Sequence, residues 1–186
     1  MKTSLFFALT IALAACVSKP MSETQTDGTA DFNGSFEKWV NGLPANRSVY
    51  TPNTIEDALF QIKADTLNTT NGQKTLLLDI EKCSPEGGRF SPGVFREIPV
   101  TEPGTYTITF SIANPATPCR LTAGGVMATD GSTRQNDIKT GPLRNESITA
   151  TVHKGEHKLR IEFNALGAGN VWLDDFKIEG PNGWTN

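Results

Sequence analysis

Two carboxylates at opposite ends of the chain are the side chains best suited to chemistry. The stretch Asn170–Glu179 is dense in β-forming residues, and an extended chain would place Trp172, Asp174 and Phe176 on one face. Asp174 would then point toward the apolar side, where an unpaired charge is very costly. Glu37 supplies a second carboxylate near the start of the folded region. We expect both ends to meet, with Glu37 and Asp174 sharing calcium; the alternative is that each pairs with a Lys or Arg.

Other residue types give little support for catalysis. The chain has two histidines, and His153 and His157 flank a predicted turn rather than lying on one helical face, as metalloprotease pairs do. The sequence contains no Gly-x-Ser-x-Gly nucleophile motif. Asp79 and Glu81 share one strand face, where a solvated polar pair is more common than a glycosidase pair. We therefore expect a non-catalytic protein.

The first sixteen residues have the features of an export signal. A basic start precedes the apolar run Leu5–Ala12, which is too short to span a bilayer permanently. The run ends in Leu13-Ala14-Ala15-Cys16, which resembles the lipobox of bacterial lipoproteins. That resemblance implies that Cys16 carries the lipid (palmitate) and becomes the mature N-terminus. The alternative is an ordinary secretory signal with a chance cysteine.

A polar tether is predicted to follow. Residues 17–31 are rich in Ser, Thr, Gly and charged residues and show no apolar periodicity. Val17, rather than Asp, follows Cys16, which resembles an outer-membrane sorting signal if the host is Gram-negative. We expect a lipid-anchored protein of the bacterial cell envelope, with one domain at 32–180 and a short C-terminal tail at 181–186.

The cysteine count and the charge complete this picture. The chain has three cysteines, so a lipidated Cys16 leaves Cys83 and Cys119, which we expect to form a disulfide in an oxidising compartment. Two unrelated buried thiols are the alternative. The formal net charge is −3, and no basic cluster is present, so nucleic acid is not an expected partner.

Alternating apolar residues predict an antiparallel β-sandwich with almost no helix. The segments 148–152 and 159–163 flank Lys154-Gly155-Glu156 and read as a β-hairpin. Residues 54–62 fit a helical period, but Phe60, Ile62 and Ala64 fit a strand equally well; we expect a short helix or an irregular segment. The other expected strands are Lys74–Glu81, Val94–Val100, Thr105–Asn114, Arg120–Ala128 and Asn170–Glu179.

Several segments resemble, in order and spacing, jelly-roll carbohydrate-binding modules with a galactose-binding-like fold. They are Asn33–Trp39 with Gly42–Pro44, Pro103–Phe110, and Gly155–Phe163 followed by Val171–Phe176. The resemblance implies a structural calcium where the first and last strands meet. Its matching ligands are Glu37 and Asp174, with backbone carbonyls near Asn33 and in the turn 70–74. It also implies glycan binding.

Two parts of the chain are candidates for contact with a glycan. The outward positions of the clearest strands carry no aromatic side chain, which argues against a flat platform for crystalline polysaccharide. Tyr50 and the loop containing Arg89 and Phe90 are the candidates for a glycan edge, whereas Phe95 is expected in the core. The alternative function is a structural or assembly lipoprotein that binds an envelope protein through the same sandwich.

Overall fold

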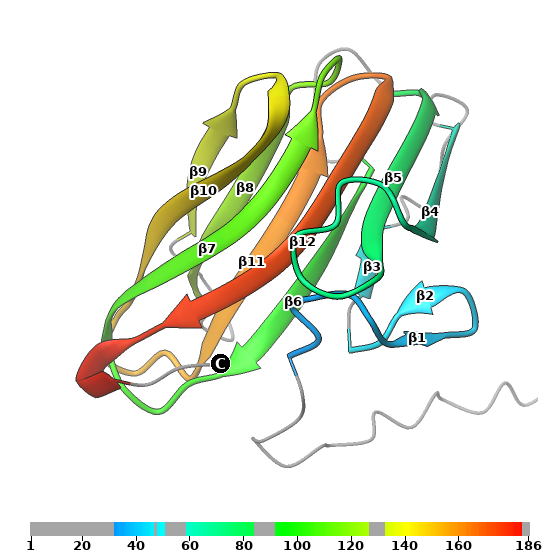
Figure 1. Ribbon diagram of the computed structural model, residues 1–186. Helices are drawn as coiled ribbons and strands as arrows, with labels where there is room; N and C mark the ends of the chain where they lie inside the picture. The colour runs from blue at the N-terminus through cyan, green and yellow to red at the C-terminus, as the bar shows by residue number, and fades with distance from the viewer. Residues whose placement is uncertain (1–31, 47, 51–58, 84–91, 127–132, 184–186) are drawn as a thin grey trace, which may run out of the picture.

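The protein is a sandwich of two five-stranded antiparallel sheets (Figure 1). The computed structural model describes residues 32–46, 48–50, 59–83, 92–126 and 133–183. The front sheet in Figure 1 has the order β10-β7-β12-β5-β4, and the back sheet has the order β3-β6-β11-β8-β9. The front strands are β10 (Gly141–Val152), β7 (Gly104–Asn114), β12 (Gly169–Glu179), β5 (Thr75–Lys82) and β4 (Leu59–Asp65). The back strands are β3 (Ser48–Tyr50), β6 (Gly93–Pro99), β11 (Lys158–Ala165), β8 (Cys119–Gly125) and β9 (Thr133–Ile138).

Strict alternation builds the core between these sheets. On β7 every second side chain, from Tyr106 to Ile112, is at most 2% exposed, and these residues face the buried alternate residues of β11. Fully burying one such side chain contributes about 1.5–3 kcal/mol. The predicted antiparallel β-sandwich is therefore confirmed. Among the described residues, no helix is long and apolar enough to cross a membrane. The only helical element among them is the single 3-10 turn η1 (Pro181–Gly183).

The expected hairpin between residues 148 and 163 is wrong. β10 pairs with β7 in the front sheet, whereas β11 pairs with β6 and β8 in the back sheet. The turn between them, closed by the Glu156 N–H on the His153 carbonyl at 3.0 Å, crosses from one sheet to the other. Both strands bury one apolar face in the same core from opposite sides. Alternation alone therefore cannot distinguish this crossing from a hairpin.

A β-bulge in β12 makes the prediction that Trp172 and Phe176 share one face wrong. The register with β7 shifts between Asp174 and Lys177, and Asp175 has φ 50°. Such a bulge inserts an extra residue and exchanges the faces of the strand beyond it. Leu173 before the bulge and Phe176 after it are both buried in the core. Trp172 and Asp174 consequently lie on the outer side of the front sheet, not with Phe176.

Residues 54–62 were expected to form a short helix or an irregular segment. Residues 59–62 belong to strand β4, which pairs with β5, so a helix there is wrong. Residues 54–58 lie outside the described residues.

The two ends of the domain do meet. The segment 32–38 runs beside β12, where the Phe176 N–H donates to the Gly34 carbonyl at 3.0 Å. Phe36 is 1% exposed, and its ring contacts Phe176 edge-on, with 5.9 Å between the centroids. A Cβ at Gly34 would lie 2.0 Å from the Phe176 carbonyl oxygen, so only glycine permits this approach. The short hairpin of β1 (Trp39–Val40) and β2 (Leu43–Pro44) follows.

Candidate functional site

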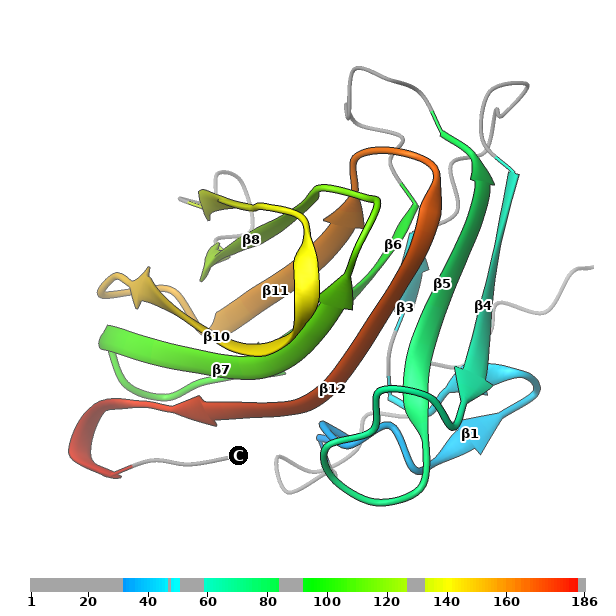
Figure 2. The same cartoon turned by 45° about the horizontal axis from the view of Figure 1, so that its top comes forward.

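The loop 66–74 joins β4 to β5 (Figures 1 and 2), and its backbone N–H groups bond to both carboxylates singled out in the sequence. Asp174 is 1% exposed, and its Oδ2 accepts hydrogen bonds from Thr70 N at 2.6 Å, Thr70 Oγ1 at 3.0 Å and Asn71 N at 2.9 Å. Its Oδ1 accepts from Asp175 N at 2.7 Å. Four donors thus satisfy this buried charge, as burial requires.

Glu37 binds the other end of the same loop. Its Oε1 accepts from Gln73 N and Lys74 N, both at 2.7 Å. The Lys74 ammonium donates to the Glu37 backbone carbonyl at 3.2 Å. Asp174 therefore accepts from the loop at residues 70–71, and Glu37 accepts from it at residues 73–74. In both cases the donors include backbone N–H groups of the loop.

This donor set does not fit a calcium ion as it is arranged. Calcium takes six to eight oxygen ligands. Asp174 Oδ2 already accepts three donors, and the Asn33 backbone carbonyl accepts from the Phe36 N–H at 3.2 Å. Within the described ranges, no cluster of three or more His, Cys, Asp or Glu side chains could hold a metal. Calcium at Glu37, Asp174 and Asn33 therefore stays a prediction that this arrangement does not support.

The expected disulfide is wrong, because Cys83 and Cys119 are not bonded to each other. Cys119 is fully buried at the start of β8, where its Sγ donates to the Thr117 carbonyl at 3.4 Å. Cys83 follows β5 in the other sheet, and its Sγ contacts the Ala165 carbonyl at 3.8 Å. Each thiol therefore turns to a separate backbone carbonyl. Burial raises the pKa of Cys119 to about 12, and it also raises the pKa of Cys83.

The outer face of the back sheet carries an aromatic ring within an ionic network. Phe95 on β6 is half-buried, and the Arg160 guanidinium of β11 lies 4.3 Å from its ring centroid. Arg160 also bridges two carboxylates, Glu97 at 3.2 Å and Glu162 at 2.9 Å. Lys158 binds Glu97 as well, at 3.1 Å. Burial works to raise the pKa of Glu97, but the contacts with Lys158 and Arg160 outweigh it and lower the pKa.

The same face continues toward both edges of the back sheet. Arg120 on β8 pairs with Asp137 on β9 at 2.7 Å. At the opposite edge, the backbone of Tyr50 in β3 pairs with Gly93, beside Phe95. Tyr50 was expected at a ligand edge, and its strand borders this face. Arg89, Phe90 and Cys16 lie outside the described residues, so their predicted roles stay predictions.

Sequence reasoning did not find the pairing of Phe95 with Arg160. Phe95 was expected in the core, yet it is half-buried, with Arg160 over its ring. One signal was available: Arg96 and Glu97 interrupt the apolar residues of β6, and Arg160 and Glu162 have the same parity on β11. The register places Arg160 opposite Glu97.

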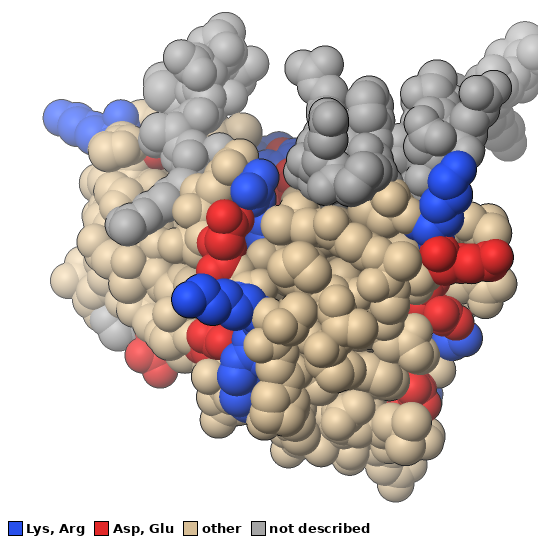
Figure 3. All heavy atoms as spheres, turned by 90° about the horizontal axis from the view of Figure 1, so that it is seen from above, with Lys and Arg blue, Asp and Glu red and all other residues tan. Residues whose placement is uncertain are grey.

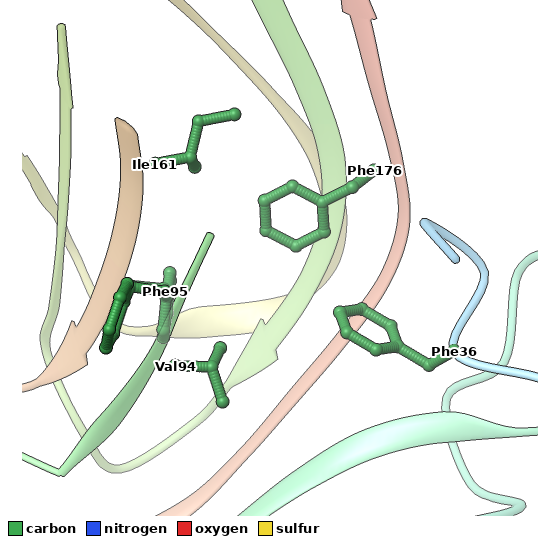
Figure 4. Close-up of a pocket in the computed structure, with 6 residues that line it drawn as sticks. Phe36, Val94, Phe95, Ile161 and Phe176 are labelled. Carbon is green, nitrogen blue, oxygen red and sulfur yellow. The ribbon is translucent and has the colours of Figure 1, made fainter. Parts of the chain in front are cut away.

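A small pocket between the sheets is unsuited to sugar. Six hydrophobic residues line it: Phe36, Val94, Phe95, Ile161, Phe163 and Phe176 (Figure 4). A glycan needs hydrogen-bond partners for its hydroxyl groups, and this lining offers no polar side chain. The pocket is therefore not a candidate glycan site, although Phe95, which also contacts Arg160, contributes to its lining.

Charged residues are also mixed on the end of the sandwich where β7 ends and β12 begins. Figure 3 views that end, with basic and acidic side chains interleaved in two groups and mostly uncharged surface between them. That view shows no continuous patch of one sign for a polyanion to bind.

The fold resembles that of solved carbohydrate-binding modules. A CBM4 structure has 15% identity and a TM-score of 0.57, covering 80% of this chain and 97% of that chain. A CBM61 structure in complex with β-1,4-galactotriose has 16% identity and a TM-score of 0.55, covering 80% of this chain and 96% of that one. At such identities the similarity is one of fold.

A third similar structure is the enzymatically active domain of bacteriophage CBA120 tailspike protein 4. It has 16% identity and a TM-score of 0.59; the match covers 80% of this chain but only 21% of that chain. This chain thus spans about a fifth of the tailspike domain. No protein-family model matches the chain, and no curated protein sequence does either.

Proposed function

We propose that the protein is a non-catalytic, lipid-anchored module that binds a neutral glycan on the outer face of its back sheet. The observation that carries this proposal is the half-buried Phe95 ring framed by Arg160, Glu97 and Glu162. Guanidinium and carboxylate groups can bind the hydroxyls of a sugar, and the part of the Phe95 ring that Arg160 leaves exposed offers an apolar contact to the sugar ring. The fold shared with carbohydrate-binding modules supports the same assignment.

The charge balance of this face favours a neutral glycan. Among the described ionic side chains there, Lys158, Arg160 and Arg120 are matched by Glu97, Glu162 and Asp137 in direct pairs. An acidic polysaccharide would have to compete with these carboxylates for the guanidinium groups. A neutral chain can instead use both partners of each pair as hydrogen-bond donor and acceptor.

Titration of the purified protein against a panel of neutral and acidic glycans tests the proposal. Phe95→Ala and Arg160→Ala should each weaken neutral-glycan binding between about two- and tenfold, the range expected for one aromatic contact. Lys63→Ala, on the front sheet, is the matched control and should leave affinity unchanged. Melting curves must show that the variants fold, and Phe95→Leu provides a milder substitution. Equal affinity in all variants, or no binding to any neutral glycan, would contradict the proposal.

Tyr50→Ala and Phe90→Ala extend this test to the residues that the sequence favoured. If the glycan crosses the face toward β3, Tyr50→Ala should weaken binding as Phe95→Ala does. Loss of binding only in the Phe90 variant would move the site to the loop before β6.

The membrane anchor rests on the sequence around Cys16. Cys16→Ser should abolish fatty-acid labelling and release the protein from the membrane fraction, and outer-membrane fractions should contain the wild-type chain. Cys83→Ser is the matched control, because that thiol lies in the folded domain. Labelling of the Cys16 variant would exclude this anchor.

A protein partner is the second candidate function, and one observation favours it. Val40 and Leu43 face each other across the β1–β2 hairpin and are 59% and 43% exposed. Adjacent exposed apolar side chains can mark a contact surface. Val40→Ser with Leu43→Ser should then abolish capture of an envelope protein while leaving glycan binding unchanged.

A further inference from the structure

Three segments far apart in the sequence converge at one corner of the sandwich: the start at 32–38, the loop 66–74, and the bulge of β12 (Figures 1 and 2). We infer that this chain closes the corner with its own hydrogen-bond donors and Lys74, so that the domain folds and keeps this loop ordered without calcium. The inference is independent of the proposed glycan binding.

The carboxylate oxygens at this corner already accept several hydrogen bonds. Two carboxylates accept six hydrogen bonds here, four at Asp174 and two at Glu37. All six donors are backbone N–H groups or the Thr70 hydroxyl, and each directs a partially positive hydrogen at the oxygen. A cation bound to the same oxygens would have to share them with those hydrogens. The donors therefore supply the positive charge that a metal would provide.

Lys74 places a cation of the chain itself at this corner. The Lys74 ammonium bonds the Glu37 carbonyl at 3.2 Å, while the Lys74 N–H bonds the Glu37 carboxylate at 2.7 Å. Lys74 therefore contacts Glu37 through both its backbone and its side chain. The positive charge of Lys74 therefore lies at the end of loop 66–74, beside Glu37.

The loop backbone also fits closely against the Glu37 carboxylate. Gly72 lies between the two held stretches of loop, with φ 91°, and a Cβ there would be 2.3 Å from Glu37 Oε1. At the loop's start, Asp65 Oδ1 accepts from Thr66 N at 2.7 Å, and Asp65 Oδ2 accepts from the Trp172 indole at 2.9 Å. Three carboxylates thus hold one nine-residue loop at its start, middle and end.

Thermal melting of the full-length protein in EGTA and in excess calcium tests the inference. We expect the same Tm in both. If the domain bound calcium, a calcium concentration of a hundred times the Kd would raise the Tm of a domain this size by about 5–10 °C. A rise of that size, or calcium binding detected by calorimetry, would overturn the inference.

Two variants separate the chain's own donors from a metal. Thr70→Val removes one donor to Asp174 but leaves every carboxylate, so a metal-held corner would not change. We expect a lower Tm and faster hydrogen exchange at the Asn71 and Lys74 amides, equally in both buffers. Lys74→Met should act likewise. Lys63→Met is its control, because it removes the same charge from the exposed pair with Asp79. Calcium that restored either variant to the wild-type Tm would show that a metal can hold the corner.

Discussion

The Asp174 carboxylate shows, at the scale of single residues, how the chain keeps a buried charge. It is 1% exposed, and its donors come from Thr70, Asn71 and Asp175. Hydrogen bonds to a charged group contribute more than those between neutral groups, about 1.5–3 kcal/mol each. The residue therefore acts by ordering backbone, and substitutions around it test that role directly.

Gly72→Ala should destabilise the fold more than an ordinary glycine substitution. The new Cβ would clash with Glu37 Oε1, 2.3 Å away, and the alanine would also have to adopt φ 91°. We expect the free energy of unfolding to fall by about 1–3 kcal/mol in chemical denaturation. Gly155→Ala is the matched control, because Gly155 has φ 95° and a Cβ there would meet no heavy atom within 4 Å. Equal costs for both variants would show that Glu37 does not crowd Gly72.

The Cys119 thiol should make stability fall at high pH. Its folded pKa of about 12 exceeds the ordinary thiol value of 9.0, because burial disfavours the thiolate. The folded state therefore keeps a proton that the unfolded state releases above pH 9. The free energy of unfolding should fall by up to about 1.4 kcal/mol for each pH unit between 9 and 12.

Comparison with Cys119→Ala isolates this contribution, since other groups also titrate in that range. The difference between wild type and variant should be constant below pH 9 and should shrink above it. A difference that stayed constant to pH 11 would show that the thiol ionises in the folded state as easily as in the unfolded one. Slow alkylation of Cys119 in native protein gives an independent measurement.

At the scale of strands, the bulge in β12 decides which side chains reach the core. Asp175 adopts φ 50°, which Asn tolerates but a β-branched residue does not. Its carboxylate also binds Asn71 at 3.0 Å and Lys177 at 2.8 Å. Asp175→Val should lower the free energy of unfolding by about 1–3 kcal/mol, whereas Asp175→Asn should change it by less than about 1 kcal/mol. If both variants were equally stable in denaturant, backbone strain would not govern this site.

The strands were predictable to the extent that alternation determined them. β5, β6, β7 and β11 lie close to the expected segments, because each buries one apolar face. Alternation could not reveal the crossing after β10, since a hairpin and a crossing bury the same residues. It could not place Trp172 either, because one residue with positive φ exchanges the faces.

The site was predictable only in part, for a related reason. Side-chain types suggested that Glu37 and Asp174 would meet, but their partners are backbone N–H groups of loop 66–74, which no residue type identifies. The disulfide prediction failed because Cys83, just after β5, and Cys119, at the start of β8, belong to different sheets and turn their thiols to different carbonyls. Pairing Phe95 with Arg160 required the register of β6 and β11.

For the whole molecule, the first seven described residues close the sandwich although they belong to neither sheet. Phe32 and Phe36 are 4% and 1% exposed, and the Arg96 guanidinium donates to the Phe32 carbonyl at 2.7 Å. Burial of two such rings contributes about 3–6 kcal/mol. That is a large share of the roughly 5–15 kcal/mol that keeps a domain folded. The segment also brings Glu37 to its loop.

A chain that begins at residue 39 should therefore be unfolded or much less stable, whereas a chain that begins at residue 32 should match the full-length protein in Tm. Circular dichroism and thermal melting of the two truncated proteins provide the measurement. Phe36→Ala in the longer chain should reproduce about 3–5 kcal/mol of the loss, since it empties one core position without shortening the backbone. A cooperative transition at the wild-type Tm in the chain that starts at residue 39 would show that the two sheets hold together without the N-terminal segment. The meeting of the two ends would then follow from folding rather than stabilise it.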